Sequence, residues 1–319
     1  MKSKKKFLSL LVFAPLLVGC GNKVQAPKFA DYGKKMASYE AFKTAVEAEL
    51  AKTSLQKAAK IGSYEVEQKE ATNVDAYESG SRKTERDKKV ISETVKHFET
   101  TSKTRYSAED LILSSESKET QSETSSDANG SSTSGGSFTS KTQFQEGKIG
   151  NKKHILYVDI TNKKYQSVKE IGSGEKPATL FDGQAKDIGL NYVMGDMNNF
   201  NTMYNTEFGD DMKAKCSFFK NGKIYTAEIK YEVKQSSENS DYKCNYNCTV
   251  QVDLTEGNFS SKFFEEEIAV DTYKKSCYSG TAKGDVVTET KLTSNEVSLK
   301  MKKVSAKAVD ISKFALFSL

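Results

Sequence analysis

The chain has 319 residues, of which 36% are hydrophobic and 29% are charged, so we expect a core that is thin relative to the surface. Four of its 48 basic residues are lysines near the N-terminus; the rest of the chain has 44 basic and 43 acidic residues, close to neutrality. Because the two signs are interspersed, the composition excludes the electrostatic footprint of a nucleic-acid-binding protein. Abundant Tyr, Phe, Ser, Thr and Lys, with only three Pro and no Trp, favour long, half-exposed strands.

The N-terminus has the pattern of a bacterial export signal. The four lysines precede an apolar run from Phe7 to Val18, which is too short to be a permanent transmembrane helix. The stretch Leu17-Val18-Gly19-Cys20 resembles a lipobox, which implies cleavage before Cys20 and a diacylglycerol, with palmitate as a typical acyl group, on its thiol. An ordinary secretory signal or an uncleaved N-terminal helix are the alternatives.

This resemblance predicts the domain organisation and the location. Residues 1–19 are expected to be a signal peptide, residues 20–30 a lipidated tether, and residues 31–319 a single mainly-β domain. The protein would be lipid-anchored on the extracytoplasmic face of a bacterial cell membrane, within the cell envelope. No second apolar run long enough to span a bilayer follows the signal, so the lipid is the predicted membrane anchor.

The first half of the domain combines one helix with strands. Apolar residues recur at three- and four-residue intervals from Ser38 to Lys60, with Ser38 as N-cap and Gly62 as stop, so we expect an amphipathic helix that covers a sheet. Strand-like pieces follow from Tyr64 to Leu113, interrupted by an exposed turn near residues 82–89 and a polar connection after Phe98. Residues 114–137 are rich in Ser, Glu, Thr and Gly, and predict a flexible insertion, either a mobile loop or an extended hairpin tip.

A hairpin is expected next, from His154 to Ile160 and from Tyr165 to Ile171. A second helical pattern covers residues 182–204, where Met and aromatic residues recur about one turn apart. Such a stripe is more often part of a core than of a ligand pocket, but Met also adapts to irregular apolar partners. Both interpretations therefore stay open for this helix.

The last third of the chain predicts antiparallel strands most clearly. Asn221-Gly222 is a two-residue hairpin turn, and apolar and polar residues alternate strictly from Tyr225 to Val233 and again from Tyr242 to Leu254. This alternation is typical of a sheet with one buried and one solvated face. Phe263 to Tyr273 and Val297 to Met301 continue the pattern, and the tail to Leu319 is expected to be an edge strand or a cover.

Four cysteines remain after Cys20, in a compartment where disulfides persist. Cys244 and Cys248 are about 13 Å apart on one strand, too far for the roughly 4.4–6.8 Å of a disulfide. Counting register from the Asn221-Gly222 turn places Cys216 opposite Ala227 and level with Cys248. We therefore predict the disulfides Cys216–Cys248 and Cys244–Cys277. Free buried thiols and a metal site are the alternatives, and strand spacing disfavours the metal site because it separates the thiols.

The order of elements resembles the LolA/LppX-like group of bacterial lipoproteins and lipid carriers. The resemblance implies an α+β, mainly β fold, in which a long curved antiparallel sheet, an incomplete barrel, is covered by an N-terminal helix and a mid-chain helix. It also implies a hydrophobic space between helices and sheet that takes acyl chains. The resemblance lies in the layout of the elements, so no residue of that group transfers to this chain.

Two functions follow as hypotheses. The first is binding of a lipid or other hydrophobic ligand between sheet and helix, by Met194, Met197, Phe200, Tyr225, Ile229, Tyr231, Tyr246 and Val250. The second is a surface-exposed structural or interaction lipoprotein with no small-molecule ligand. A lined apolar cavity would favour the first and a filled core the second. No nucleophile, metal-binding or nucleotide-binding motif is found, so we expect neither an enzyme nor a cofactor.

Overall fold

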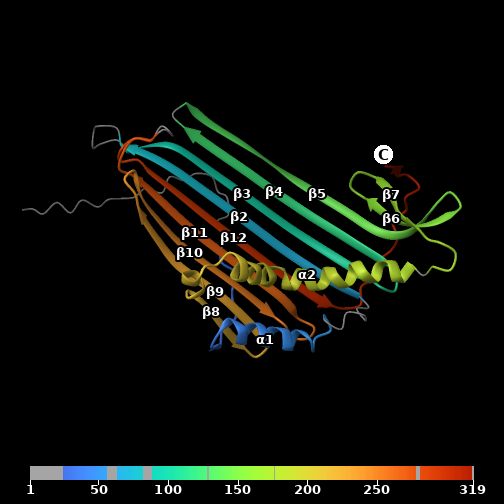
Figure 1. The fold of residues 1–319 in the computed structure, drawn as a ribbon. Coiled ribbons are helices and arrows are strands. Elements are labelled where there is room, and N and C mark those ends of the chain that lie inside the picture. Colours follow the sequence, from blue (N-terminus) through green and yellow to red (C-terminus); the bar gives the residue numbers. More distant parts are fainter. Residues whose placement is uncertain are drawn as a thin grey trace, which may run out of the picture.

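The computed structural model describes residues 24–55, 63–81, 88–127, 129–175, 177–277 and 281–317. Its dominant feature is one 13-stranded sheet in the order β1-β8-β9-β10-β11-β12-β2-β3-β4-β5-β6-β7-β13. Within the described residues, neighbouring strands pair antiparallel, except β13 with β7, which are parallel. The sheet is long, curved and open, with helices on one face (Figure 1). This confirms the expected mainly β fold with two covering helices.

The elements have the following bounds. The helices are α1 (Tyr39–Leu50), α2 (Pro177–Thr206) and α3 (Asp210–Lys213). The strands of the first half are β1 (Lys34–Lys35), β2 (Ser63–Ser81), β3 (Lys88–Ser107), β4 (Ile112–Asp127), β5 (Gly130–Ile149), β6 (Lys152–Asp159) and β7 (Lys164–Glu170). Those of the second half are β8 (Cys216–Asn221), β9 (Ile224–Ser236), β10 (Ser240–Asp253), β11 (Phe259–Tyr273), β12 (Val286–Met301) and β13 (Ala315–Leu316).

Local sequence explains where α1 begins. Ser38 is the N-cap, and its side chain accepts a hydrogen bond from the Ala41 backbone N–H at 3.2 Å. The helix ends at Leu50, earlier than the periodicity predicts, and residues 51–55 form turns.

The mid-chain helix, α2, begins at Pro177 rather than near residue 182. Proline is in its first turn, where the missing N–H costs no hydrogen bond. No helix in the described residues is long and apolar enough to cross a bilayer.

The helices pack on one face of the sheet, which we call the inner face; the opposite face is the outer face. Alternation along each strand sends one set of side chains to the inner face. There the strands β8 to β12, together with the start of β2, contribute a continuous core, and α2 lies across β10, β11 and β12 (Figure 1). Tyr64, Val66 and Leu299 are among its fully buried members. The core therefore fills the β8–β12 half of the inner face and continues along one end of the sheet through Tyr106 of β3, Leu113 of β4 and Ile155 of β6.

The other half of the sheet departs from the sequence predictions. Strand β3 runs without a break from Lys88 to Ser107, so the polar connection expected after Phe98 is part of the strand. Residues 114–127 lie in β4 and residues 130–137 in β5, and the two strands pair from Leu113 with Phe144 to Asp127 with Gly130. This corrects the expected flexible insertion in favour of the extended hairpin. Polar residues can form strands here because most of this hairpin is a single layer with water on both faces, where neither set of alternating side chains needs to be apolar.

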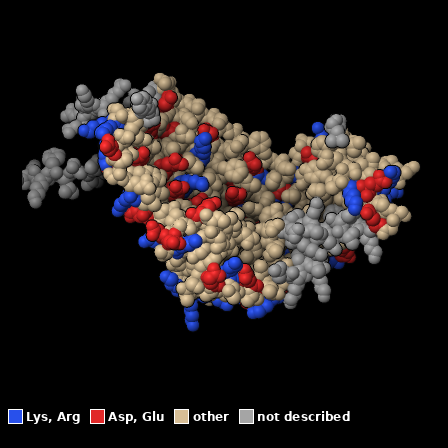
Figure 2. All heavy atoms as spheres, viewed as in Figure 1, with Lys and Arg blue, Asp and Glu red and all other residues tan. Residues whose placement is uncertain are grey.

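Charges of both signs are mixed on the face that carries α2. Figure 2 shows Lys and Arg interspersed with Asp and Glu over this face, without a large area of one sign. Charges also pair across strands on both faces, such as Lys96 with Glu123 at 3.2 Å on the inner face and Lys141 with Glu116 at 2.8 Å on the outer face. Such pairs between exposed side chains each contribute only about 0.2–1 kcal/mol. They favour the correct register of the single-layer strands more than they add stability.

Candidate functional site

The inner face brings together the eight residues that the sequence predicts as a ligand pocket. Those on α2 meet those on β9 and β10, and six of them are at most 4% exposed: Met194, Met197, Phe200, Tyr225, Ile229 and Val250. Tyr231 and Tyr246 pack at the margin of this core, with their rings stacked at a centroid distance of 4.9 Å. Four surface pockets of 230 to 610 Å³ lie among the described residues, and none of these four is lined by any of the eight. They therefore form a filled core at the expected place.

A buried carboxylate in this interface was missed by the sequence analysis. Asp196 of α2 accepts hydrogen bonds from Asn295 Nδ2 at 3.0 and 3.1 Å and from Ser261 Oγ at 3.1 Å. Burial raises the pKa of Asp196. The pKa of Glu70 is also raised, mainly by burial and to a lesser extent by repulsion from Asp196. The sequence did contain an indication of this buried carboxylate, because Asp196 lies within a stripe of Met and aromatic residues. Its three bonds tie α2 to β11 and β12, which is a positioning role.

The outer face carries the N-terminal segment, residues 24–32, which we call the strap. The Lys28 carbonyl accepts a hydrogen bond from the Lys262 side chain on β11, and the strap ends at β1 beside β8. At its start, the Val24 backbone N–H lies 2.8 Å from the Asn73 amide oxygen when that amide nitrogen donates to His97. Val24 and Pro27 are buried. The strap thus crosses the outer face from the β2–β3 side to the β8 edge.

One glutamine holds the strap at its centre. Gln251 Oε1 accepts from the Ala30 backbone N–H at 2.8 Å, and Gln251 Nε2 donates to the Ala30 carbonyl at 3.2 Å and to Thr226 Oγ1 at 2.9 Å. The side chain of Gln251 is only 4% exposed, although it belongs to the polar, outward set of β10. Cover by the strap explains this burial. The side-chain amide thus bonds both the N–H and the carbonyl of Ala30, as the backbone of a neighbouring strand would.

The C-terminal segment is held on the outer face by the same device. Gln145 of β5 accepts from the Val309 backbone N–H at 2.7 Å and donates to the Val309 carbonyl at 3.0 Å. Gln143 donates to the Lys307 carbonyl at 3.0 Å. The chain then reaches β13, which pairs with β7. Both ends of the described chain are therefore fixed to the face opposite the helices.

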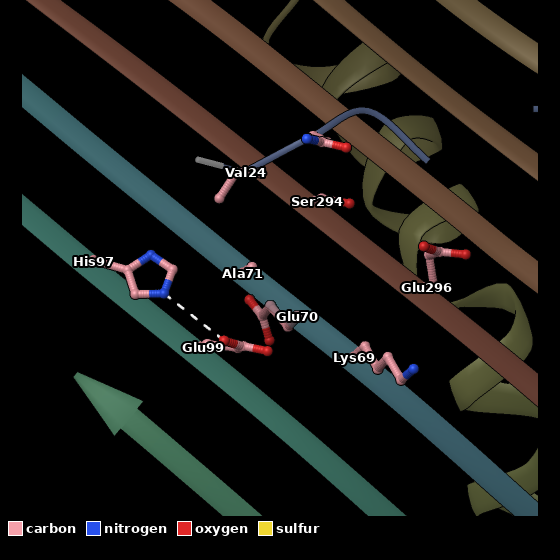
Figure 3. Close-up of a pocket in the computed structure, with 9 residues that line it drawn as sticks. Val24, Lys69, Glu70, Ala71, His97, Glu99, Ser294 and Glu296 are labelled. Atoms are coloured by element: carbon pink, nitrogen blue, oxygen red, sulfur yellow. Dashed lines mark ion pairs between the residues drawn. The ribbon is translucent and has the colours of Figure 1, made fainter. Parts of the chain in front are cut away.

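A pocket of about 410 Å³ lies at the start of the strap. Its lining comes from the strap and from β2, β3 and β12, with α2 on the far side of the sheet (Figure 3): Val24, Gln25, Lys69, Glu70, Ala71, His97, Glu99, Ser294 and Glu296. The strand residues belong to the outer face except Glu70, which alternates with Lys69 and Ala71 and belongs to the inner face with Asn295. The His97 ring lies 3.8 Å from the Glu99 carboxylate. The lining is polar and charged, unlike an acyl-chain site. In the described residues, no group of His, Cys, Asp and Glu is arranged to hold a metal ion.

The predicted disulfides are corrected: Cys216, Cys244, Cys248 and Cys277 are all free thiols. Cys216 and Cys248 both lie opposite Ile229, so they are level, as expected, although Cys216 does not lie opposite Ala227. Strand β9 between them sets a separation of about 9.6 Å, two strand spacings, which exceeds the reach of a disulfide.

The second predicted bridge also fails on register. Cys244 pairs with Ala269, well inside β11, whereas Cys277 lies beyond Tyr273 at the end of that strand. Burial raises the pKa of the Cys216 thiol to about 11 and that of Cys248 to about 12, so both are protonated at neutral pH. The predicted lipidation site, Cys20, lies outside the described residues.

Comparisons with known proteins add little to this geometry. No protein-family model matches the chain, and no curated protein matches it. Among solved structures, the crystal structure of Pseudomonas aeruginosa OccK7 (OpdD) matches 74% of this chain and 99% of its own, at 5% identity and a TM-score of 0.21. A score this low carries no argument, so the function has to be argued from the residues themselves.

Proposed function

We propose that this protein is a lipid-anchored protein of the extracytoplasmic face of a bacterial membrane, and that it acts as an interaction protein with no small-molecule ligand. The observation that carries the proposal is the position of Val24. Val24 is buried on the outer face, beside His97 and Glu99, only four residues after Cys20 of the predicted lipobox. The anchor and the folded domain are thus close together.

The length of the tether limits the orientation. Four residues span at most about 14 Å. Asn73 is eight residues from Ser81, the nearer end of β2, which corresponds to about 26 Å along the strand. An acyl chain on Cys20 therefore leaves from the outer face and not from the end of the long strands. In this proposal the outer face is turned toward the membrane, and the helix-covered inner face is turned away from it.

The interaction class is supported by how the sheet is packed. The residues expected to contact a lipid are buried against each other, and the pocket beside Val24 is polar. Lipid carriage would need an apolar cavity. In contrast, strands β4 and β5 present most of their length to solvent on both faces. Such a surface suits contact with another macromolecule.

The anchor can be tested by labelling cells with palmitate and separating membranes from soluble protein. We expect label on the wild type, and none on Cys20→Ala, which should leave the membrane fraction or stay unprocessed. Cys277→Ala is the matched control and should keep both label and membrane association. Palmitate label on Cys20→Ala, together with normal processing and membrane retention, would refute the proposed anchor.

A further inference from the structure

Strand β5 forms an open edge of the sheet over more than half of its length. It pairs with β4 from Gly130 to Phe144, but with β6 only from Thr142 onward. Residues 130–141 therefore lie at the margin of the sheet, seen along the top of the ribbon in Figure 1. All of them except Gly136 are exposed. Lys141 contacts residues 160 and 161, so only residues 130–140 are called the β5 edge below.

The backbone direction along the β5 edge follows from its last neighbour. The Lys141 N–H donates to Thr161 Oγ1 at 2.8 Å, and the Lys141 carbonyl accepts from the Ile160 N–H at 2.9 Å. Lys141 therefore turns its backbone groups away from β4. By the two-residue alternation of an antiparallel ladder, five more residues do the same. In the described chain no partner is found for these outward N–H and C=O groups, of Ser131, Thr133, Gly135, Ser137 and Thr139.

The β5 edge lacks the features that keep natural edge strands from pairing. Charged side chains, proline and bulges are the usual protection. The β5 edge has no charged residue and no proline, and its pairing with β4 shows no register shift. The edge of β9 beyond β8 is different, since it carries Lys230, Glu232 and Lys234. Figure 2 shows few charges along the upper margin, where β5 lies. Of these two open edges, the β5 edge is the unprotected one.

We propose that the β5 edge pairs with the β5 edge of a second copy of this chain, antiparallel about a two-fold axis at Gly135. This register places Ser131 opposite Thr139 and Thr133 opposite Ser137. About ten backbone hydrogen bonds then form, because each of the five outward residues contributes one donor and one acceptor in each copy. Facing Ser and Thr pairs are favourable, and no like charges meet.

The position of the anchor argues for a second copy as the occupant, and this step rests on the proposed function. Two antiparallel edge strands in one continuous sheet are related by a two-fold axis perpendicular to the sheet. Such an axis keeps both outer faces on the same side of the combined sheet. Val24 of each copy, and so each lipid anchor, is then on that side as well. Two lipidated copies in one membrane can therefore pair at this edge without either anchor leaving the bilayer. A two-fold axis in the plane of the sheet would place the anchors on opposite sides.

The test compares the masses of full-length chains in nonionic detergent, by size-exclusion chromatography with light scattering and subtraction of the detergent. The wild type is expected to have the mass of two chains. The double variant Thr133→Lys/Ser137→Lys places lysine opposite lysine twice in the dimer and is expected to have the mass of one chain. Thr133→Lys/Ser137→Glu places opposite charges at the same positions and is expected to remain a dimer. Both altered side chains are exposed, so the fold should be retained.

A second variant tests the backbone pairing itself. Ser137→Pro removes an outward N–H without removing a bond to β4, because proline is tolerated at the open side of an edge strand. We expect it to be monomeric with an unchanged circular dichroism spectrum. A wild type with the mass of one chain, with or without another polypeptide bound, would overturn the second-copy proposal, as would equal masses for the two charge variants. Because the readout is mass, the dimer can fail while palmitate labelling succeeds, and the reverse.

Discussion

The clamp that Gln251 makes on the strap leads to a quantitative prediction. Replacing Gln251 with Leu keeps the approximate size of the side chain, but removes both hydrogen bonds to Ala30. A typical internal hydrogen bond contributes about 1 kcal/mol net, so detachment of the strap should become easier by about 2 kcal/mol. That corresponds to a population of detached strap about 30-fold higher. The Ala30 amide should exchange with solvent deuterium faster by the same factor.

Hydrogen–deuterium exchange followed by mass spectrometry measures this directly, in peptides that cover residues 24–32. Gln235→Leu is the matched control, since Gln235 is an exposed residue of β9 and the same substitution there should leave the strap unchanged. Amides in β11 and β12 should also keep their wild-type rates in both variants. An unchanged Ala30 exchange rate in Gln251→Leu would refute the clamp.

Three further predictions follow from the core, the charges and the thiols. Phe200→Ala should lower the free energy of unfolding by about 3–5 kcal/mol in a denaturant titration, because the ring is fully buried; a change below 1 kcal/mol would contradict a filled core. Burial would raise the pKa of Glu65, but bonds from Lys302 and Arg105 outweigh it and lower the pKa to about 2. The stability that Glu65 provides is therefore present above about pH 4.5 and is lost as the pH falls toward 2. The free energy of unfolding of Glu65→Gln should thus fall less steeply with acid than that of the wild type, and identical profiles would contradict this. Cys248 should resist alkylation in the folded protein and react after denaturation without reductant, whereas a mass two hydrogens lower per bridge would show disulfides instead.

Local pattern was sufficient wherever a segment has one buried and one solvated face. The alternation from Tyr225 to Val233 and from Tyr242 to Leu254 predicted β9 and β10, and Ser38 predicted the start of α1. It was insufficient in the single-layer part of the sheet. There neither face is buried, so β3 to β5 have no apolar period, and residues 114–137 were predicted as a flexible insertion.

The candidate sites divide in the same way. The sequence placed the Met and aromatic stripe of α2 against the sheet, but whether the contact is a cavity or a filled core depends on how side chains from distant segments fit together. The cysteines were placed level by register, but β9 between Cys216 and Cys248 rules out the bridge. Asp196 was passed over because its partners, Ser261 and Asn295, are 65 and 99 residues away.

The sequence by itself determined a mainly β chain with two covering helices, because the periodicity of apolar residues records which face of each element is buried. It also predicts the lipobox, since targeting signals are linear. Only the tertiary structure decided the order of the strands, the strap that crosses the outer face, and the open edge of β5. These depend on pairing between segments up to 237 residues apart, as in Glu65 with Lys302, and such contacts leave no local pattern in the chain.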